Sequence, residues 1–299
     1  MAKGGHLGNP GHMVWYKSGG VSGVVANGGN FKTWFLIISG LLGVLALTAC
    51  QLEEQNRGDS EPENWRAFTP RAAGIEDMDA KGLFETGLKP VYPKEVKCLE
   101  VTSSFGSGYR GDGSLRNPEF YQGRHGGMDI PATEGTPILA VASGTVIHKK
   151  VGGGLGGILI FLQHAPEDTG LPAWTYTEYK HLREMPDVVI GQRVEMGQVI
   201  ARTGATGTVG RYYPMGHSHL HLTAFFGPRK DFIARRFFVP VEGEWLDPLA
   251  LFKGPPLRSA VIRDFPDDQK MVQVPYKTTD GRFVPEGTKV VWPYAYEPR

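Results

Sequence analysis

The feature that most constrains the fold is a series of short apolar segments between residues 96 and 252, each bounded by Gly, Pro or Asp. They are rich in β-branched and aromatic residues and read, in order, "VKCLEVTSSFG", "TPILAVASGTVIHKK", "GGILIFLQHA", "WTYTEYKHL", "QVIARTG" and "SHLHLTAFFG". Such runs, separated by turn residues, predict β-strands joined by tight turns. Because no ten-residue window here has a convincing helical period, we predict a mostly β domain over 96–252.

Composition agrees with a turn-rich β domain and argues against one class of partner. The chain holds 41 Gly and 22 Pro, and 11% of its residues are aromatic, which is not typical of a bundle of long helices. The formal net charge is +1 and the sequence has no basic stripe, so we expect no nucleic-acid partner.

The amino-terminal region has the pattern of a targeting signal. The uncharged segment "WFLIISGLLGVLALTA", residues 34–49, follows Lys32 and ends in small residues, which is typical of a secretory signal. The alternative is a membrane-spanning helix, which needs about 20 apolar residues. The stretch "LTAC", residues 47–50, resembles the lipobox of bacterial lipoproteins, and this implies lipidation of Cys50. By the same resemblance, Gln51 suits sorting to the outer membrane of a two-membrane bacterium, facing the periplasm.

Domain boundaries follow from changes in composition. We expect a lipoprotein signal region over 1–49 and a polar, flexible linker over 50–95, with "GIEDMDAKGLFETG" as a short helix within it. The β domain over 96–252 would close with a helical turn at "LDPLALF". Residues 253–299 form a Pro-rich C-terminal extension.

The two cysteines do not form a metal-binding pair. Neither Cys50 nor Cys98 belongs to a CxxC motif, which argues against cysteine-based zinc binding. Nothing in "EVKCLEV" supplies a base to activate a thiolate, so we interpret Cys98 as a small buried apolar residue.

One strand carries alternating histidines, in "GHSHLHLTAFFG". Because residues two apart on a strand point to the same side, His219 and His221 face together, with Leu220 facing the core. Two adjacent imidazoles are poor packing groups, since each has a donor and an acceptor to satisfy. They suit a metal ligand and its neighbour.

A second cluster lies upstream in "GRHGGMDIP". His125 and Asp129 are separated by three residues, and Gly126 and Gly127 would let the backbone bend so that both side chains converge. With either His219 or His221 they make a His-Asp-His set. Catalytic zinc sites have three protein ligands and one open position for water.

The motifs together resemble the lysostaphin/LytM-type zinc metallopeptidases, which cut peptide bridges in bacterial cell walls. The match rests on "SSFG", "HGGMDI", "GTPILAVASGTV", "YKHL", "GQVIARTGATG" and "HLH", in family order over about residues 98–227. It implies a compact antiparallel β-sheet or barrel-like domain of the duplicated hybrid motif type, with a groove over a central sheet.

The resemblance also implies roles for single residues. His125, Asp129 and His221 would bind one Zn²⁺ per chain, while His181 of "YKHL" and His219 would be catalytic without binding the metal. The chain has no HExxH motif, so a histidine must replace the glutamate base of thermolysin-like enzymes. Where the family usually has Gly-Pro before HLH, this chain has His217 and Ser218.

Four further residues have less specific interpretations. His217 is either a residue of the groove rim or an extension of the site. Tyr179, two residues before His181 and so expected on the same face, either lines the groove or packs. His148 and His164 are interpreted as ordinary surface or hydrogen-bonded histidines.

Three functions are compatible with these patterns. The first is a zinc metalloendopeptidase of peptidoglycan stem peptides or crosslinks, held in the cell envelope by a lipid anchor. The second is a non-catalytic relative that activates cell-wall amidases. The third is a plain metal-binding lipoprotein, which would not explain the Gly-rich strand pattern around the histidines.

Overall fold

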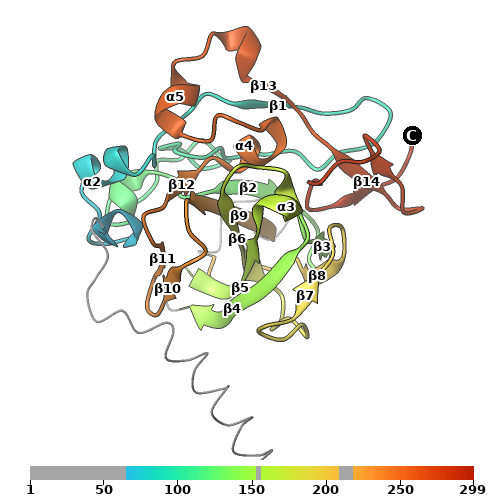
Figure 1. Cartoon of the computed structure of the whole chain (residues 1–299), viewed down its shortest axis with the longest axis horizontal. Coiled ribbons are helices and arrows are strands. Elements are labelled where there is room, and N and C mark those ends of the chain that lie inside the picture. The colour runs from blue at the N-terminus through green and yellow to red at the C-terminus, as the bar shows by residue number, and fades with distance from the viewer. Residues whose placement is uncertain (1–64, 153–155, 209–217) are drawn as a thin grey trace, which may run out of the picture. The chain divides into compact units, whose positions relative to one another are not determined.

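A computed structural model describes residues 65–152, 156–208 and 218–299, all within one compact unit, 56–299 (Figure 1). The predicted signal region, Cys50 and His217 lie outside the described residues. Within the described part of the chain, no helix has the length and apolar character needed to cross a membrane.

A seven-stranded antiparallel sheet forms the centre of the fold, with the order β12-β9-β6-β5-β4-β7 and β2 paired to β9 (Figure 1). This confirms the mostly β, antiparallel prediction. The strands are β2 (Met128–Pro131), β4 (Gly144–Gly152), β5 (Gly157–His164), β6 (Trp174–Leu182), β7 (Arg193–Val194), β9 (His219–Gly227) and β12 (Glu244–Leu246).

Smaller elements surround this sheet. The other strands are β1 (Lys89–Val91), β3 (Pro137–Leu139), β8 (Val199–Arg202), β10 (Phe232–Ala234), β11 (Phe238–Pro240), β13 (Met271–Gln273), β14 (Tyr276–Thr278), β15 (Phe283–Val284) and β16 (Ala295–Tyr296). The helices are short: η1 (Trp65–Phe68), α2 (Ile75–Ala80), η2 (Tyr121–Gly123), α3 (Pro166–Thr169), α4 (Pro248–Lys253), α5 (Ser259–Arg263) and η4 (Asp267–Lys270). Helix α4 lies at the predicted helical turn, and its N-cap Asp247 accepts a hydrogen bond from the Leu249 amide.

The prediction of a strand in "VKCLEVTSSFG" is wrong. This segment makes only isolated bridges, between Val96 and Pro298 and between Ser103 and Asp129. Its apolar side chains, such as Leu99, instead pack against the core. Cys98 is half-buried there, and burial, followed by the charge of Glu100, raises the pKa of its thiol to about 11. This agrees with the packing interpretation.

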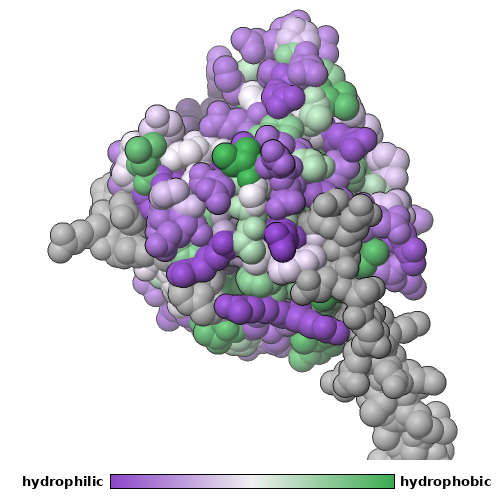
Figure 2. All heavy atoms as spheres, turned by 90° about the vertical axis from the view of Figure 1, so that its left-hand side faces the viewer, coloured by the Kyte–Doolittle hydropathy of each residue, from purple (hydrophilic) through white to green (hydrophobic). Residues whose placement is uncertain are grey.

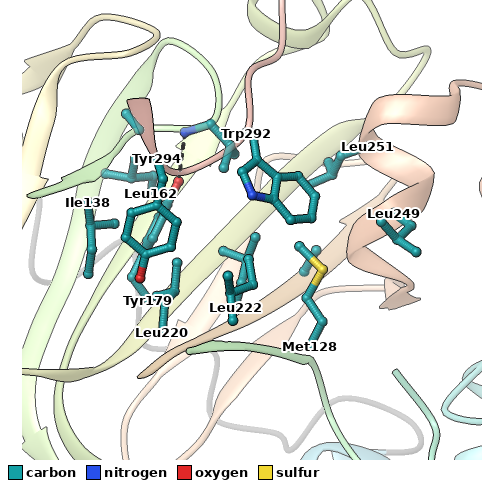
Figure 3. Packing of buried hydrophobic residues seen from close by; sticks show 14 of the residues in the cluster. Met128, Ile138, Leu162, Tyr179, Leu220, Leu222, Leu249, Leu251, Trp292 and Tyr294 are labelled. Carbon is teal, nitrogen blue, oxygen red and sulfur yellow. Dashed lines mark hydrogen bonds between the residues drawn. The ribbon is translucent and has the colours of Figure 1, made fainter. Parts of the chain in front are cut away.

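One face of the sheet is covered by the large core shown in Figure 3. Leu220 and Leu222 of β9 and Tyr179 of β6 contribute to it, as does the C-terminal extension through the fully buried Trp292 and Tyr294. The extension therefore packs on the β domain and completes its core.

The other face carries a second cluster, which is rich in aromatic rings. Phe225 of β9 and Trp245 of β12 pack there with Phe68 of η1, and the indole of Trp245 donates a hydrogen bond to the carbonyl of Ala67. The described part of the expected linker, residues 65–95, is thus folded. This segment is polar on average, but a few of its apolar side chains, such as Met78, are fully buried and hold it on the domain.

His164 is a buried histidine with hydrogen bonds at both ring nitrogens, whereas His148 is half-buried. The two ring nitrogens of His164 lie 2.7 Å from the Ser143 carbonyl oxygen and 2.8 Å from Thr177 Oγ1. Among the described residues, the buried Nε2 of His148 has no hydrogen-bond partner.

We expect His164 to make the fold less stable in acid. Burial lowers its pKa to about 4 in the folded state, against about 6.5 unfolded. The unfolded chain therefore binds the proton more tightly. The contribution of His164 to the free energy of unfolding is fully present above pH 6.5, and about 3 kcal/mol is lost as the pH falls to 4. Unfolding free energies at pH 7 and pH 4.5, compared with those of His164→Gln, measure this contribution. An equal pH dependence in both proteins would contradict it.

Candidate metal centre and its groove

Three side chains converge at the junction of β2 and β9. Asp129 of β2 stands directly opposite His221 of β9 in the strand register. His125 Nε2 lies 3.1 Å from Asp129 Oδ1 and 3.0 Å from His221 Nδ1, and His221 Nδ1 lies 2.9 Å from Asp129 Oδ1. A tetrahedral ion bound at 2.0–2.1 Å needs ligand atoms about 3.3 Å apart. The triangle is close to that size.

The hydrogen bonds behind the triangle point the lone pairs inward. His125 Nδ1 lies 2.9 Å from the Ser104 carbonyl oxygen, an acceptor only, so this nitrogen carries the proton and Nε2 has the lone pair. His221 Nε2 lies 3.0 Å from Thr223 Oγ1, which allows the same arrangement with Nδ1 unprotonated. Two nitrogen lone pairs and a carboxylate oxygen then face one another at about 3 Å, which a cation such as zinc would neutralise.

The environment favours the protonation states that a metal requires. Burial lowers the pKa of His125 and lowers that of His221 well below its usual value. Burial alone would raise the pKa of Asp129, but the charges of His125 and His219 and two histidine hydrogen bonds outweigh it and hold the pKa well below its usual range. The carboxylate is therefore ionised, and the lowered pKa values of His125 and His221 make it easier for a metal to displace their protons, as zinc binding requires.

The two glycines between His125 and Asp129 act by their small size. The backbone bends at both residues, as predicted, although neither has a positive φ. A Cβ on Gly127 would lie 2.4 Å from the Leu222 carbonyl oxygen and 2.9 Å from His221 Nε2. A Cβ on Gly126 would lie 3.1 Å from the Trp245 ring. Glycine therefore lets this segment approach β9 and the aromatic cluster closely.

His181 and His219 stand beside the triangle. Their ring centroids are 4.7 Å apart, and His219 Nε2 lies 3.6 Å from Asp129 Oδ1. His181 Nδ1 donates to the Thr206 carbonyl oxygen at 2.8 Å, which leaves its Nε2 as the acceptor. Burial, followed by the charge of His219, lowers the pKa of His181 to about 3, so this ring is neutral at physiological pH.

A β-bulge turns His181 toward the groove. The register between β5 and β6 shifts here, from Leu159 opposite Lys180 to Ile158 opposite Leu182, and His181 has a φ of 63°. Bulges of this kind re-aim side chains near functional sites. Lys180 and His181 consequently both line the groove.

The expectation that Tyr179 shares a face with His181 is therefore wrong. Tyr179 is fully buried on the opposite face, where its hydroxyl accepts a hydrogen bond from the Val141 amide at 3.0 Å (Figure 3). It packs in the core and does not line the groove.

Arg116 is a site residue that sequence reasoning missed. Its Nη2 lies 3.0 Å from Asp129 Oδ2, the oxygen turned away from the triangle, and donates to Ser103 Oγ at 2.7 Å. The contact holds the carboxylate in place. Arg116 lies in a loop that has no periodic sequence pattern. The only sequence signal for its role is that this loop comes just before His125.

A groove with a volume of about 360 Å³ is lined by all five histidine and aspartate side chains of the site. Its walls include aromatic residues of the second cluster, such as Phe68 and Trp245. Figure 2 shows the face of the molecule on the side of α2, which is largely hydrophilic with scattered apolar areas.

Comparison with known proteins gives one family and several distant relatives. Residues 123–229 match peptidase family M23. The chain is 35% identical to a protein of Haemophilus influenzae over 85 residues (28% of this chain, 18% of that one). It is 37% identical to a lipoprotein NlpD/LppB homolog of Pseudomonas aeruginosa over 84 residues (27% of this chain, 25% of that one). A zinc-containing peptidase of Vibrio cholerae is 25% identical over 50% of this chain and 38% of that one, with a TM-score of 0.33. The chain thus spans a quarter or less of the length of these two sequence relatives.

Proposed function

We propose, from the match of residues 123–229 to peptidase family M23, that the protein is a zinc-dependent endopeptidase of peptidoglycan. Its substrates would be peptide bonds of the stem peptides or crosslinks, and a lipid on Cys50 would hold it in the cell envelope. The observation that supports this most is the convergence of the His125, Asp129 and His221 ligand atoms, next to two further histidines, on the floor of one groove.

The mechanism assigns each histidine a task. His125, Asp129 and His221 would hold zinc, which when bound polarises the scissile carbonyl and acidifies water. The acceptor Nε2 of His181 takes the proton of the attacking water, because its Nδ1 is fixed by the Thr206 carbonyl. His219, beside the Asp129 carboxylate, orients the water and stabilises the charge that develops on the substrate oxygen.

An alternative function is activation of a cell-wall amidase without catalysis. The similarity to a lipoprotein NlpD/LppB homolog supports it, together with the proposed lipid anchor. A site that only binds a protein partner has no use for three convergent ligand atoms and a neutral, oriented His181. The endopeptidase therefore accounts for more of the described geometry.

Digestion of purified peptidoglycan tests this function. We expect the purified full chain in detergent, loaded with zinc, to remove crosslinked fragments, and a chelator to abolish the loss. Mass spectrometry of the fragments identifies the bond. Restored cleavage after zinc is added back excludes damage by the chelator. If a folded, zinc-loaded protein leaves the fragments unchanged, the endopeptidase is excluded and the amidase activator takes its place.

A further inference from the structure

We propose that Lys150 and Arg236 form a subsite that binds a carboxylate of the substrate, about three strand spacings from the metal centre. The proposal rests on the proposed endopeptidase function and names the chemistry of the substrate that this groove selects: an acidic peptide rather than a neutral one. It concerns two residues for which the ligand set and the catalytic histidines provide no role.

One row of side chains crosses the floor of the groove. In the strand register, Lys150 of β4 is opposite Leu159 of β5, Leu159 is opposite Lys180 of β6, Lys180 is opposite His221 of β9, and His221 is opposite Asp129 of β2. All five line the groove. The groove therefore runs across the strands, from the metal centre at β2 and β9 to Lys150 on β4.

The row of paired residues gives the distance between the metal centre and Lys150. Neighbouring strands are about 4.8 Å apart, so three spacings separate His221 from Lys150 by roughly 14 Å. An extended peptide advances about 3.3 Å per residue. A substrate that lies along the groove with its scissile bond at the metal centre would therefore reach Lys150 about four or five residues away.

The tip of the β10–β11 hairpin brings Arg236 to the same end of the groove. Lys150 Nζ donates to the carbonyl oxygens of Arg235 and Arg236, at 3.4 and 3.2 Å. The guanidinium of Arg236 lies 5.5 Å from the centre of the Phe237 ring, and both residues line the groove. Two cationic side chains thus lie together at this end.

The charges of the groove are unbalanced at this end. Its salt bridges join Arg116 to Asp129, Lys180 to Glu178, and Arg124 to Asp79. Within the part of the chain that the structure describes, Lys150 and Arg236 have no carboxylate partner in a salt bridge. The two internal segments outside it, 153–155 and 209–217, contain no Asp or Glu.

A carboxylate from the substrate would correct this imbalance. Burial lowers the pKa of Lys150, and the charge of Glu178, which is salt-bridged to Lys180, offsets this only in part. An anionic partner at this point would therefore stabilise the charged form of Lys150. The whole chain has a formal net charge of only +1, so the unpaired cations are a local feature of the groove. Arg236 lies beyond residues 123–229, so this part of the subsite is contributed by sequence outside the family match.

The test compares one substrate in two charge states. A crosslinked stem-peptide dimer, purified from peptidoglycan, is used with its carboxylates free and with them converted to primary amides. We expect kcat/KM to fall about tenfold on amidation, mainly through KM, and to fall with added salt for the free acid alone. Lys150→Gln and Arg236→Gln should each lower kcat/KM about fivefold for the free acid and leave the amide unchanged.

Arg235→Gln is the matched control, because it removes the same charge from the neighbouring residue, which does not line the groove. Synthetic peptides with Glu or Gln at successive positions should show the strongest preference for Glu four or five residues from the cleaved bond. Cleavage of acid and amide at equal rates, with no effect of either variant, overturns the carboxylate subsite and leaves the peptidase intact. If neither dimer is cleaved, the proposed function fails. Calorimetric binding of the two dimers then decides, and equal affinities overturn the subsite.

Discussion

Replacing His221 by alanine is expected to remove both the bound zinc and the hydrolysis of peptidoglycan. His221 Nδ1 is one of three ligand atoms spaced 2.9–3.1 Å apart, and the other two cannot enclose a tetrahedral ion. We expect zinc content to fall below a tenth of an equivalent and activity to fall at least 10³-fold, as on loss of a catalytic metal. Metal analysis of the dialysed protein and the peptidoglycan digest measure the two effects.

His125→Ala should behave in the same way, because its Nε2 completes the same triangle. His148→Ala is the control, since this half-buried histidine lies outside the site, against Phe161. Circular dichroism shows whether each variant is folded. A His221→Ala protein that keeps one zinc and full activity would contradict the ligand assignment.

The second large effect is expected for His181→Ala, which should keep its bound zinc but lose most of its activity. His181 contributes no ligand atom to the triangle, so His181→Ala should keep one equivalent of zinc. Its Nε2 is the acceptor that the mechanism uses, and loss of a general base lowers the rate by roughly 10²–10⁴-fold. The same two assays, metal analysis and digestion, are applied to this variant.

The outcome for His181→Ala distinguishes a catalytic from a structural role. Loss of zinc from this variant would show that the ring holds the metal centre together, and it would overturn the assignment. His219→Ala provides the comparison within the site, because it removes the other histidine that is not a predicted ligand and leaves the Thr206 contact of His181 in place. The variant with the greater loss of kcat identifies the proton acceptor.

The sequence alone determined those parts of the site that depend on local period. Alternation on β9 places His219 and His221 on one face and Leu220 on the other, as predicted, because successive side chains of a strand point to opposite sides. The Gly, Pro and Asp residues of the turns likewise predicted where most strands of the central sheet begin and end. These features need no information beyond a window of about ten residues.

The tertiary structure decided what depends on pairing between distant segments. The register of β2 against β9 sets Asp129 opposite His221, and the bulge on β6 turns His181 into the groove and leaves Tyr179 in the core. The burial of Trp292, and the row that aligns Lys150 with the metal centre, have the same origin. A strand's own sequence specifies which residues alternate, but only its partner strands determine the register, the bulges and the residues that meet across them.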